Sequence, residues 1–216
     1  MVALDSAARA PSQIRFNLPA LLIGGGLAGA IWAAAGPLAF LGFTYEGWSL
    51  ANRATDEFAG LMFLVPFLAP AVATLFSGQR KTTRRDYRRL ALGFVAAYAI
   101  HLSVAILAAT IDGERLGAIG TANIAFQLLM LSSLVATSGV WFRDVTNHPL
   151  CRQFQNATLW FFWLAYTFAY IGHFDGPHIA DASFGIGLMV LVVALLVRFS
   201  GALKSVWVRP MAEKVG

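Results

Sequence analysis

Apolar residues fill six long stretches of the chain, and short polar segments separate them. Each stretch is close to the about 20 residues that a helix needs to cross about 30 Å of hydrocarbon. The stretches are continuously apolar instead of alternating, which favours helices over the strands of a membrane barrel. The sequence therefore predicts an all-α fold, one six-helix transmembrane domain over residues 1–216, with spans at about 18–43, 58–77, 90–111, 120–142, 155–174 and 180–200.

The basic residues are distributed unevenly over the segments between these spans. If both termini are cytoplasmic, 14 of the 16 Lys and Arg residues lie on the inner side, and only Arg53 and Arg115 lie on the outer side. Cytoplasmic loops of membrane proteins carry an excess of Lys and Arg. We therefore expect both termini in the cytoplasm. The inner set comprises Arg9, Arg15, Arg80, Lys81, Arg84, Arg85, Arg88, Arg89, Arg143, Arg152, Arg198, Lys204, Arg209 and Lys214.

The composition agrees with this class of protein. Hydrophobic residues make up 58% of the 216 residues and charged residues 12%, whereas soluble domains have about 45–50% and about 25%. A water-soluble enzyme is thereby excluded. The net charge of +5 requires no nucleic-acid partner, because basic clusters beside a span contact anionic lipid. The lipid bilayer is the expected partner. The single cysteine, Cys151, cannot form an internal disulfide.

Small and polar residues within the spans indicate how the helices pack. Small residues recur at four-residue spacing in the first span, around Gly24-Gly25-Gly26 and Gly29, so another helix can approach closely there. The fourth span carries Asn123, Gln127 and Ser133, which are typical of hydrogen bonds between helices and less often line a path for a solute.

Two histidines lie within the predicted spans, where an ionisable side chain is expensive and suggests a function. His101 lies 12 residues beyond Arg89, hence roughly 18 Å from the inner surface at about 1.5 Å per residue. Such an imidazole is hydrogen-bonded, charged with a partner, or bound to a metal. His173 closes the fifth span. The other two, His148 and His178, adjoin prolines in loops, and we expect them to be solvated.

Alanine and tyrosine surround both span histidines at helical spacing. Ala97, Tyr98 and Ala105 share a face with His101. Ala165, Ala169 and Tyr170 share a face with His173. Small side chains beside a histidine suit a flat macrocycle, and they equally suit a close neighbouring helix. The pattern therefore leaves a haem ligand and a hydrogen-bonded core histidine as alternatives.

Two histidines on two spans are the number that bis-histidine haem ligation requires, one imidazole from each of two facing helices. Under this hypothesis His101 and His173 are the axial ligands of the haem iron. Ala97, Ala105, Ala165 and Ala169 form the walls, with Tyr98 and Tyr170 beside them. The spans show no nucleophile with a base, no Gly-rich phosphate loop and no metal-type carboxylate cluster, so hydrolytic chemistry has no candidate residues.

The order of short motifs along the chain resembles the ferric-reductase-like transmembrane family, especially the haem-binding membrane subunits of bacterial methionine-sulfoxide reductase systems. The resembling segments are Leu68-Ala69-Pro70, Arg84-Arg85-Asp86-Tyr87-Arg88-Arg89-Leu90, Tyr98-Ala99-Ile100-His101-Leu102, Ala136-Thr137-Ser138 and Gly172-His173-Phe174. Together they cover most of the chain in order, and only the histidines carry chemistry.

The resemblance implies a b-type haem protein of the bacterial inner membrane that passes electrons, with His101 and His173 at the family's haem positions. It also implies a quinol or flavin reductase as electron donor and a redox partner protein. The family has an earlier histidine in the fifth span, whereas this chain has Trp160 and other aromatic residues there. One haem toward the outer half is therefore expected. The alternative is a haem-free membrane subunit, assembly factor or small-solute transporter, in which the histidines are hydrogen-bonded core groups.

Overall fold

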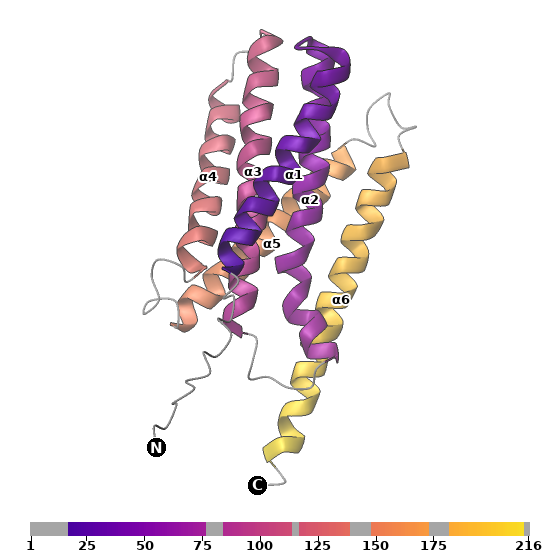
Figure 1. Ribbon diagram of the computed structural model, residues 1–216. Helices are drawn as coiled ribbons and strands as arrows, with labels where there is room; N and C mark the ends of the chain where they lie inside the picture. The colour runs from indigo at the N-terminus through magenta and orange to yellow at the C-terminus, as the bar shows by residue number, and fades with distance from the viewer. Residues whose placement is uncertain (1–16, 77–83, 114–116, 139–147, 173–181, 214–216) are drawn as a thin grey trace, which may run out of the picture.

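The computed structural model describes the backbone of residues 17–76, 84–113, 117–138, 148–172 and 182–213. Within these ranges the chain forms six helices (Figure 1). They are α1 (Leu18–Leu41), α2 (Tyr45–Phe76), α3 (Arg84–Ile111), α4 (Ala118–Thr137), α5 (Pro149–Gly172) and α6 (Ala182–Glu213). The all-helical prediction is thereby confirmed for the described residues.

Five of the six helices are long and apolar enough to cross a membrane. The apolar segments are Leu18–Leu41, Tyr45–Phe76, Arg88–Ile111, Gly120–Thr137 and Gly185–Lys204. Large apolar side chains also cover their outer surface, for example Trp32 at 82% exposure and Phe40 at 91%. A surface of this kind is stable only against hydrocarbon, so the protein is a helical membrane protein.

The predicted start of the second span is wrong. The sequence places this span at 58–77, whereas α2 begins at Tyr45 and is 32 residues long, about 48 Å at 1.5 Å per residue. Gly42 turns the chain with a φ of 69°, and the Thr44 hydroxyl accepts a hydrogen bond from the Gly47 N–H at 3.2 Å, which caps the new helix. The polar residues after this turn are therefore helical and do not form a loop.

The other predicted spans agree more closely with the structure. The first was expected at 18–43 and the third at 90–111, and the structure gives Leu18–Leu41 and Arg84–Ile111. The fourth was expected at 120–142, and α4 ends at Thr137, beyond which 139–147 lie outside the described residues. The last two, expected at 155–174 and 180–200, correspond to Pro149–Gly172 and Ala182–Glu213. The earlier starts of α3 and α5 and the longer end of α6 consist of charged or polar turns that hydropathy does not detect.

Helix α2 lies at the centre of the bundle, in contact with α1, α3, α5 and α6 (Figure 1). Helix α3 packs against α1, α2 and α4, and α5 packs against α4 and α6. Of the small residues predicted to allow close approach, Gly26 does so against α3 and Gly29 against Phe58 of α2, whereas Gly24 and Gly25 meet nothing within 4 Å. A Cβ atom on Gly26 would lie 2.3 Å from the carbonyl oxygen of Gly93. The α1–α3 contact therefore requires glycine at this crossing.

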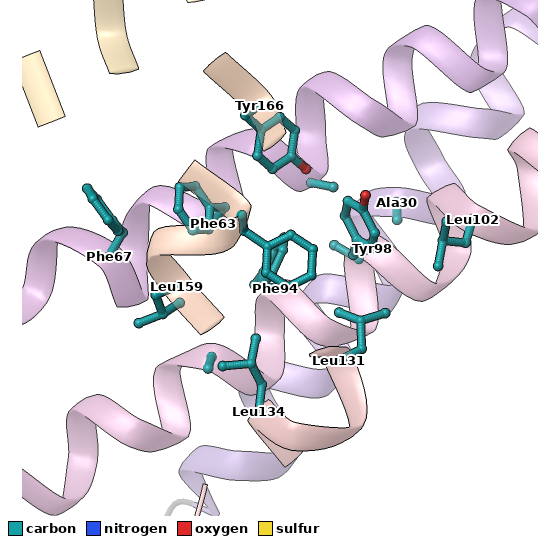
Figure 2. Close-up of a cluster of buried hydrophobic side chains, with 14 of the residues drawn as sticks. Ala30, Phe63, Phe67, Phe94, Tyr98, Leu102, Leu131, Leu134, Leu159 and Tyr166 are labelled. Atoms are coloured by element: carbon teal, nitrogen blue, oxygen red, sulfur yellow. The ribbon is translucent and has the colours of Figure 1, made fainter. Parts of the chain in front are cut away.

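Aromatic side chains fill the space between α2, α3 and α5 (Figure 2). Phe63, Phe67 and Phe94 are 0% exposed and Phe162 is 1% exposed. The ring centroids of Phe94 and Phe162 are 4.9 Å apart, and those of Phe63 and Phe94 are 5.4 Å apart. We call these four residues the aromatic layer. Edge-to-face packing at such distances is favourable for aromatic rings.

Candidate functional site: a buried imidazole beside a carboxylate

His101 lies on α3, where its imidazole faces two polar side chains of α2. The His101 Nε2 is 3.5 Å from Asp56 Oδ1, and the His101 Nδ1 is 3.3 Å from Thr55 Oγ1. Thr55 and Asp56 are neighbours in the segment that helix α2 adds before the expected start of the second span. The structure thus pairs His101 with a carboxylate that hydropathy had assigned to a loop.

The pair is shielded from the surroundings to different degrees on its two sides. Thr55 is 0% exposed, the His101 side chain is 12% exposed and the Asp56 side chain is 37% exposed. An ionisable pair inside an apolar bundle is rare, and it is stable only where the two groups compensate each other or reach water. The more open side of the site is therefore the carboxylate side.

Thr55 restricts where the protons of the pair can be. Its hydroxyl lies 2.9 Å from the carbonyl oxygens of both Ala51 and Asn52, closer than the 3.3 Å to His101 Nδ1. A hydroxyl has one proton to donate and two lone pairs to accept with. With its proton directed to the shorter backbone contacts, Thr55 accepts a hydrogen bond from a protonated Nδ1.

Tyrosines from two helices complete the surroundings of the pair. The Tyr98 ring lies 5.3 Å from the His101 ring, and its hydroxyl donates to Gln127 Oε1 on α4 at 3.2 Å. Asp56 acts electrostatically on Tyr98, Tyr166 and Tyr170. Gln127 in turn donates to Asn123 Oδ1 at 3.3 Å. Arg53 and Glu57 of α2 also act electrostatically on Tyr170.

Three buried polar atoms near the site have no hydrogen-bond partner within the part of the chain that the structure describes. They are Trp48 Nε1, Asn52 Oδ1 and Tyr166 Oη. Trp48, Asn52 and Asp56 are four residues apart on α2 and share one face of this helix. Figure 2 shows the hydroxyl groups of Tyr98 and Tyr166 on the same side of Phe63 and Phe94. Buried polar atoms without protein partners are commonly satisfied by water.

The remaining predicted site residues lie in varied surroundings. Ala97 is 0% and Tyr98 7% exposed, both in the main core. Ala105 and Ala165 are half-buried, as is Tyr170, and Ala169 is exposed. His173 lies outside the described residues, so its distance from His101 is not defined. The described alanines therefore do not all line one space.

An axial haem ligand makes a specific demand on a histidine side chain. Such a ligand needs a nitrogen with a free lone pair that points into open apolar space. Both nitrogens of His101 instead face oxygen atoms of α2, and one of these oxygens belongs to a wholly buried threonine. As placed, His101 does not fit haem ligation, and the imidazole would have to turn away from α2 to bind iron.

His148 and the polar residues of the fourth span behave as the sequence indicates. His148 is exposed, and its Nδ1 accepts a hydrogen bond from the Leu150 N–H at 3.3 Å at the start of α5. Ser133 of α4 and Thr158 of α5 share a hydrogen bond at 3.1 Å. Together with the Tyr98–Gln127 bond, this contact connects neighbouring helices. His178 lies outside the described residues.

Sequence reasoning missed Asp56, whose carboxylate faces the His101 imidazole. A usable signal was present, because Trp48, Asn52, Thr55, Asp56 and Ala59 follow one another at helical spacing after Thr44.

Comparisons with known protein families, characterised proteins and solved structures find no match to this chain.

Proposed function

We propose that the protein is an integral membrane protein that binds and releases a proton at the His101–Asp56 pair inside its helical bundle. It thereby belongs to the haem-free alternative, as a membrane subunit or a small-solute transporter that uses this proton. One observation carries the proposal: both ring nitrogens of His101 face oxygen atoms, at 3.3 Å and 3.5 Å. Buried acidic and histidine side chains in membrane proteins commonly serve as proton relays.

The two faces of the imidazole define a state that holds the extra proton. Nδ1 donates to Thr55, and the second proton lies between Nε2 and Asp56, on either partner. An imidazolium with a carboxylate and a neutral imidazole with a carboxylic acid carry the same number of protons. In both forms the pair has no net charge, which suits an apolar bundle.

Release of the proton is possible without leaving a ring nitrogen unsatisfied. After release, Nε2–H donates to an ionised Asp56 and Nδ1 becomes an acceptor. The Thr55 hydroxyl then turns from the carbonyls of Ala51 and Asn52 to donate to Nδ1. Both carbonyls keep their helical hydrogen bonds, so this rotation costs little. Thr55 is thus a positioning residue that serves both protonation states.

Nuclear magnetic resonance of ring nitrogens tests the proposal directly. The full chain is labelled with ¹⁵N-histidine, placed in lipid nanodiscs and titrated, and His101→Gln identifies the signal. We expect the His101 nitrogens to pass reversibly between a form with a protonated Nδ1, whose Nε2 is protonated or accepts from Asp56, and a form that is protonated at Nε2 alone. Asp56→Asn should shift this transition, whereas Glu57→Gln, its neighbour in an exposed ion pair with Arg53 at 3.1 Å, should leave it in place. His101 signals that do not change with pH would overturn the proposal.

The topology belongs to the same proposal. We place six spans in the membrane, with α5 as the sixth beside the five apolar helices, and both termini in the cytoplasm. The support is the distribution of basic residues, of which 14 of 16 then lie inside. The end of the bundle where α1 ends and α2 begins is then the outer end. A bacterial inner membrane rests on the family resemblance alone.

A b-type haem protein that passes electrons is the second candidate. It is supported by the order of sequence segments that resemble the ferric-reductase-like family. The haem would be held by His101 and His173. A quinol or flavin reductase would donate the electrons, and a redox protein would accept them.

An absorption spectrum separates the two candidates. The chain is purified in mild detergent from haem-replete cells, and haem is quantified per chain before and after dithionite. We expect no reduced α-band and far less than one haem per chain. About one low-spin haem per chain that is lost in His101→Ala, but not in His148→Ala, would establish the second candidate instead.

A further inference from the structure

The surroundings of the pair differ between the two ends of the bundle. Toward the end where α1 ends and α2 begins, the next residues on the Asp56 face of α2 are Asn52 and Trp48. Each has a buried polar atom without a partner among the described residues. At the level of Asn52 and Asp56, the Arg53–Glu57 ion pair is exposed on the same helix, with side-chain exposures of 38% and 46%.

Toward the opposite end, the aromatic layer lies behind the pair, with the Tyr98 ring between Phe94 and His101. Phe94 is two helical turns before His101 on α3, and Phe63 is two turns after Asp56 on α2. The contacts between these rings continue to Phe162 and Phe67, so rings from α2, α3 and α5 close the space between the helices (Figure 2). All four side chains are at most 1% exposed. Such a layer has no polar atoms with which to hold water.

We infer that water and the proton reach the His101–Asp56 pair from the α1–α2 end, along Trp48 and Asn52, and that the aromatic layer closes the opposite side. This inference rests on the proposed function, because it assigns a direction of access to the same site. Trp48 Nε1 needs an acceptor and Asn52 Oδ1 needs a donor, and a water molecule can provide either. The exposed part of Asp56 lies on this side of the aromatic layer.

The direction of access predicts that the reactivity of introduced cysteine thiols changes sharply along one face of α2. Asn52 and Asp56 lie before the aromatic layer, and Ala59 lies one turn further toward it and is 0% exposed. Single cysteines are introduced as Asn52→Cys, Asp56→Cys and Ala59→Cys in the full chain with Cys151→Ser. Each variant is placed in nanodiscs, where both membrane faces are accessible, and treated with a charged methanethiosulfonate.

We expect the thiols of Asn52→Cys and Asp56→Cys to react at least about tenfold faster than that of Ala59→Cys, since buried thiols are inert and water-exposed thiols react. Phe94→Ala should raise the rate at Ala59→Cys by opening the layer. If Asn52→Cys does not fold, Asp56→Cys carries the same comparison. Equal rates at all three positions, or a rate highest at Ala59→Cys, would overturn the inferred route.

The outcome is distinguishable from a failure of the proposed function. If the cysteines show no preference while the His101 nitrogens still titrate, the route is wrong and the proton site stands. If the cysteines react as expected while His101 does not titrate, water reaches the site but the pair does not exchange a proton. In that case the inference, which assigns the proton to this route, falls together with the proposed function.

Discussion

The imidazole of His101 meets the carboxylate of Asp56 across the α2–α3 contact, with 3.5 Å between Nε2 and Oδ1. These residues belong to different helices, and α2 and α3 pack directly against each other. At this distance the charge and hydrogen bonding of each group depend on the other. A change in one should therefore alter the effect of a change in the other.

A double-mutant cycle measures this coupling. We expect His101→Gln and Asp56→Asn together to destabilise the protein less than the sum of the two single changes. The difference should be about 0.5–3 kcal/mol, as for residues in direct contact. The control cycle is Arg53→Gln with Glu57→Gln, an exposed pair for which at most about 0.5 kcal/mol is expected. Unfolding in mixed micelles gives both values, and additive effects at His101 and Asp56 would contradict a direct contact.

Replacing Thr55 tests its role as hydrogen-bond partner of Nδ1. Thr55→Val keeps the shape of the side chain and removes the hydroxyl. A lost hydrogen bond to a charged group costs more than one to a neutral group, by about 1 kcal/mol. The proton affinity of the pair should therefore fall by roughly fivefold, at 1.36 kcal/mol per pKa unit. Thr55→Ser keeps the hydroxyl and should retain the affinity. The ¹⁵N titration of His101 reads both variants, and an unchanged titration in Thr55→Val would rule out this role.

Gly26 and its neighbour Gly25 provide a variant and a matched control for the contact between α1 and α3. A Cβ on Gly26 would lie 2.3 Å from the Gly93 carbonyl oxygen, whereas a Cβ on Gly25 meets nothing within 4 Å. We expect Gly26→Ala to destabilise the protein by about 1–3 kcal/mol through overpacking. Gly25→Ala should remain within about 0.5 kcal/mol of the native chain. Thermal unfolding in detergent compares the two, and equal midpoints would show that α1 does not cross α3 at Gly26.

Arg198 of α6 connects three helices in the other half of the bundle. Its guanidinium donates to the Phe67 carbonyl of α2 and to Asn156 Oδ1 of α5. It also lies 4.4 Å from the centroid of the Phe67 ring and 5.6 Å from that of Trp160. Partly buried cation–π contacts and charged hydrogen bonds each contribute about 2 kcal/mol.

Arg198→Met should therefore destabilise the protein by about 2 kcal/mol or more. Lys204→Met is the matched control, because the exposed Lys204 ammonium donates to the Leu75 carbonyl at 2.7 Å. We expect it to change the stability by at most about 0.5 kcal/mol. Unfolding by a denaturing detergent measures both variants. Similar losses in the two would mean that Arg198 acts only as a charge near the membrane surface.

Hydropathy found the apolar helices because the hydrophobic effect acts on local composition. It failed at the start of α2, where Arg53, Asp56 and Glu57 interrupt the apolar pattern. In the structure Arg53 and Glu57 form an ion pair one turn apart, and Asp56 turns to His101. A helix can therefore include charges when each has a partner, and the partner of Asp56 is remote in sequence.

The sequence by itself determined the class of the protein and the number of helices among the described residues. Each of these follows from the composition of short segments. Only the tertiary structure decided that both nitrogens of His101 face α2, that Asp56 is its partner, and that Ala97 is buried whereas Ala169 is exposed. The physical reason is that a membrane helix is apolar on every side, so hydrophobicity does not distinguish the face toward lipid from the face toward another helix.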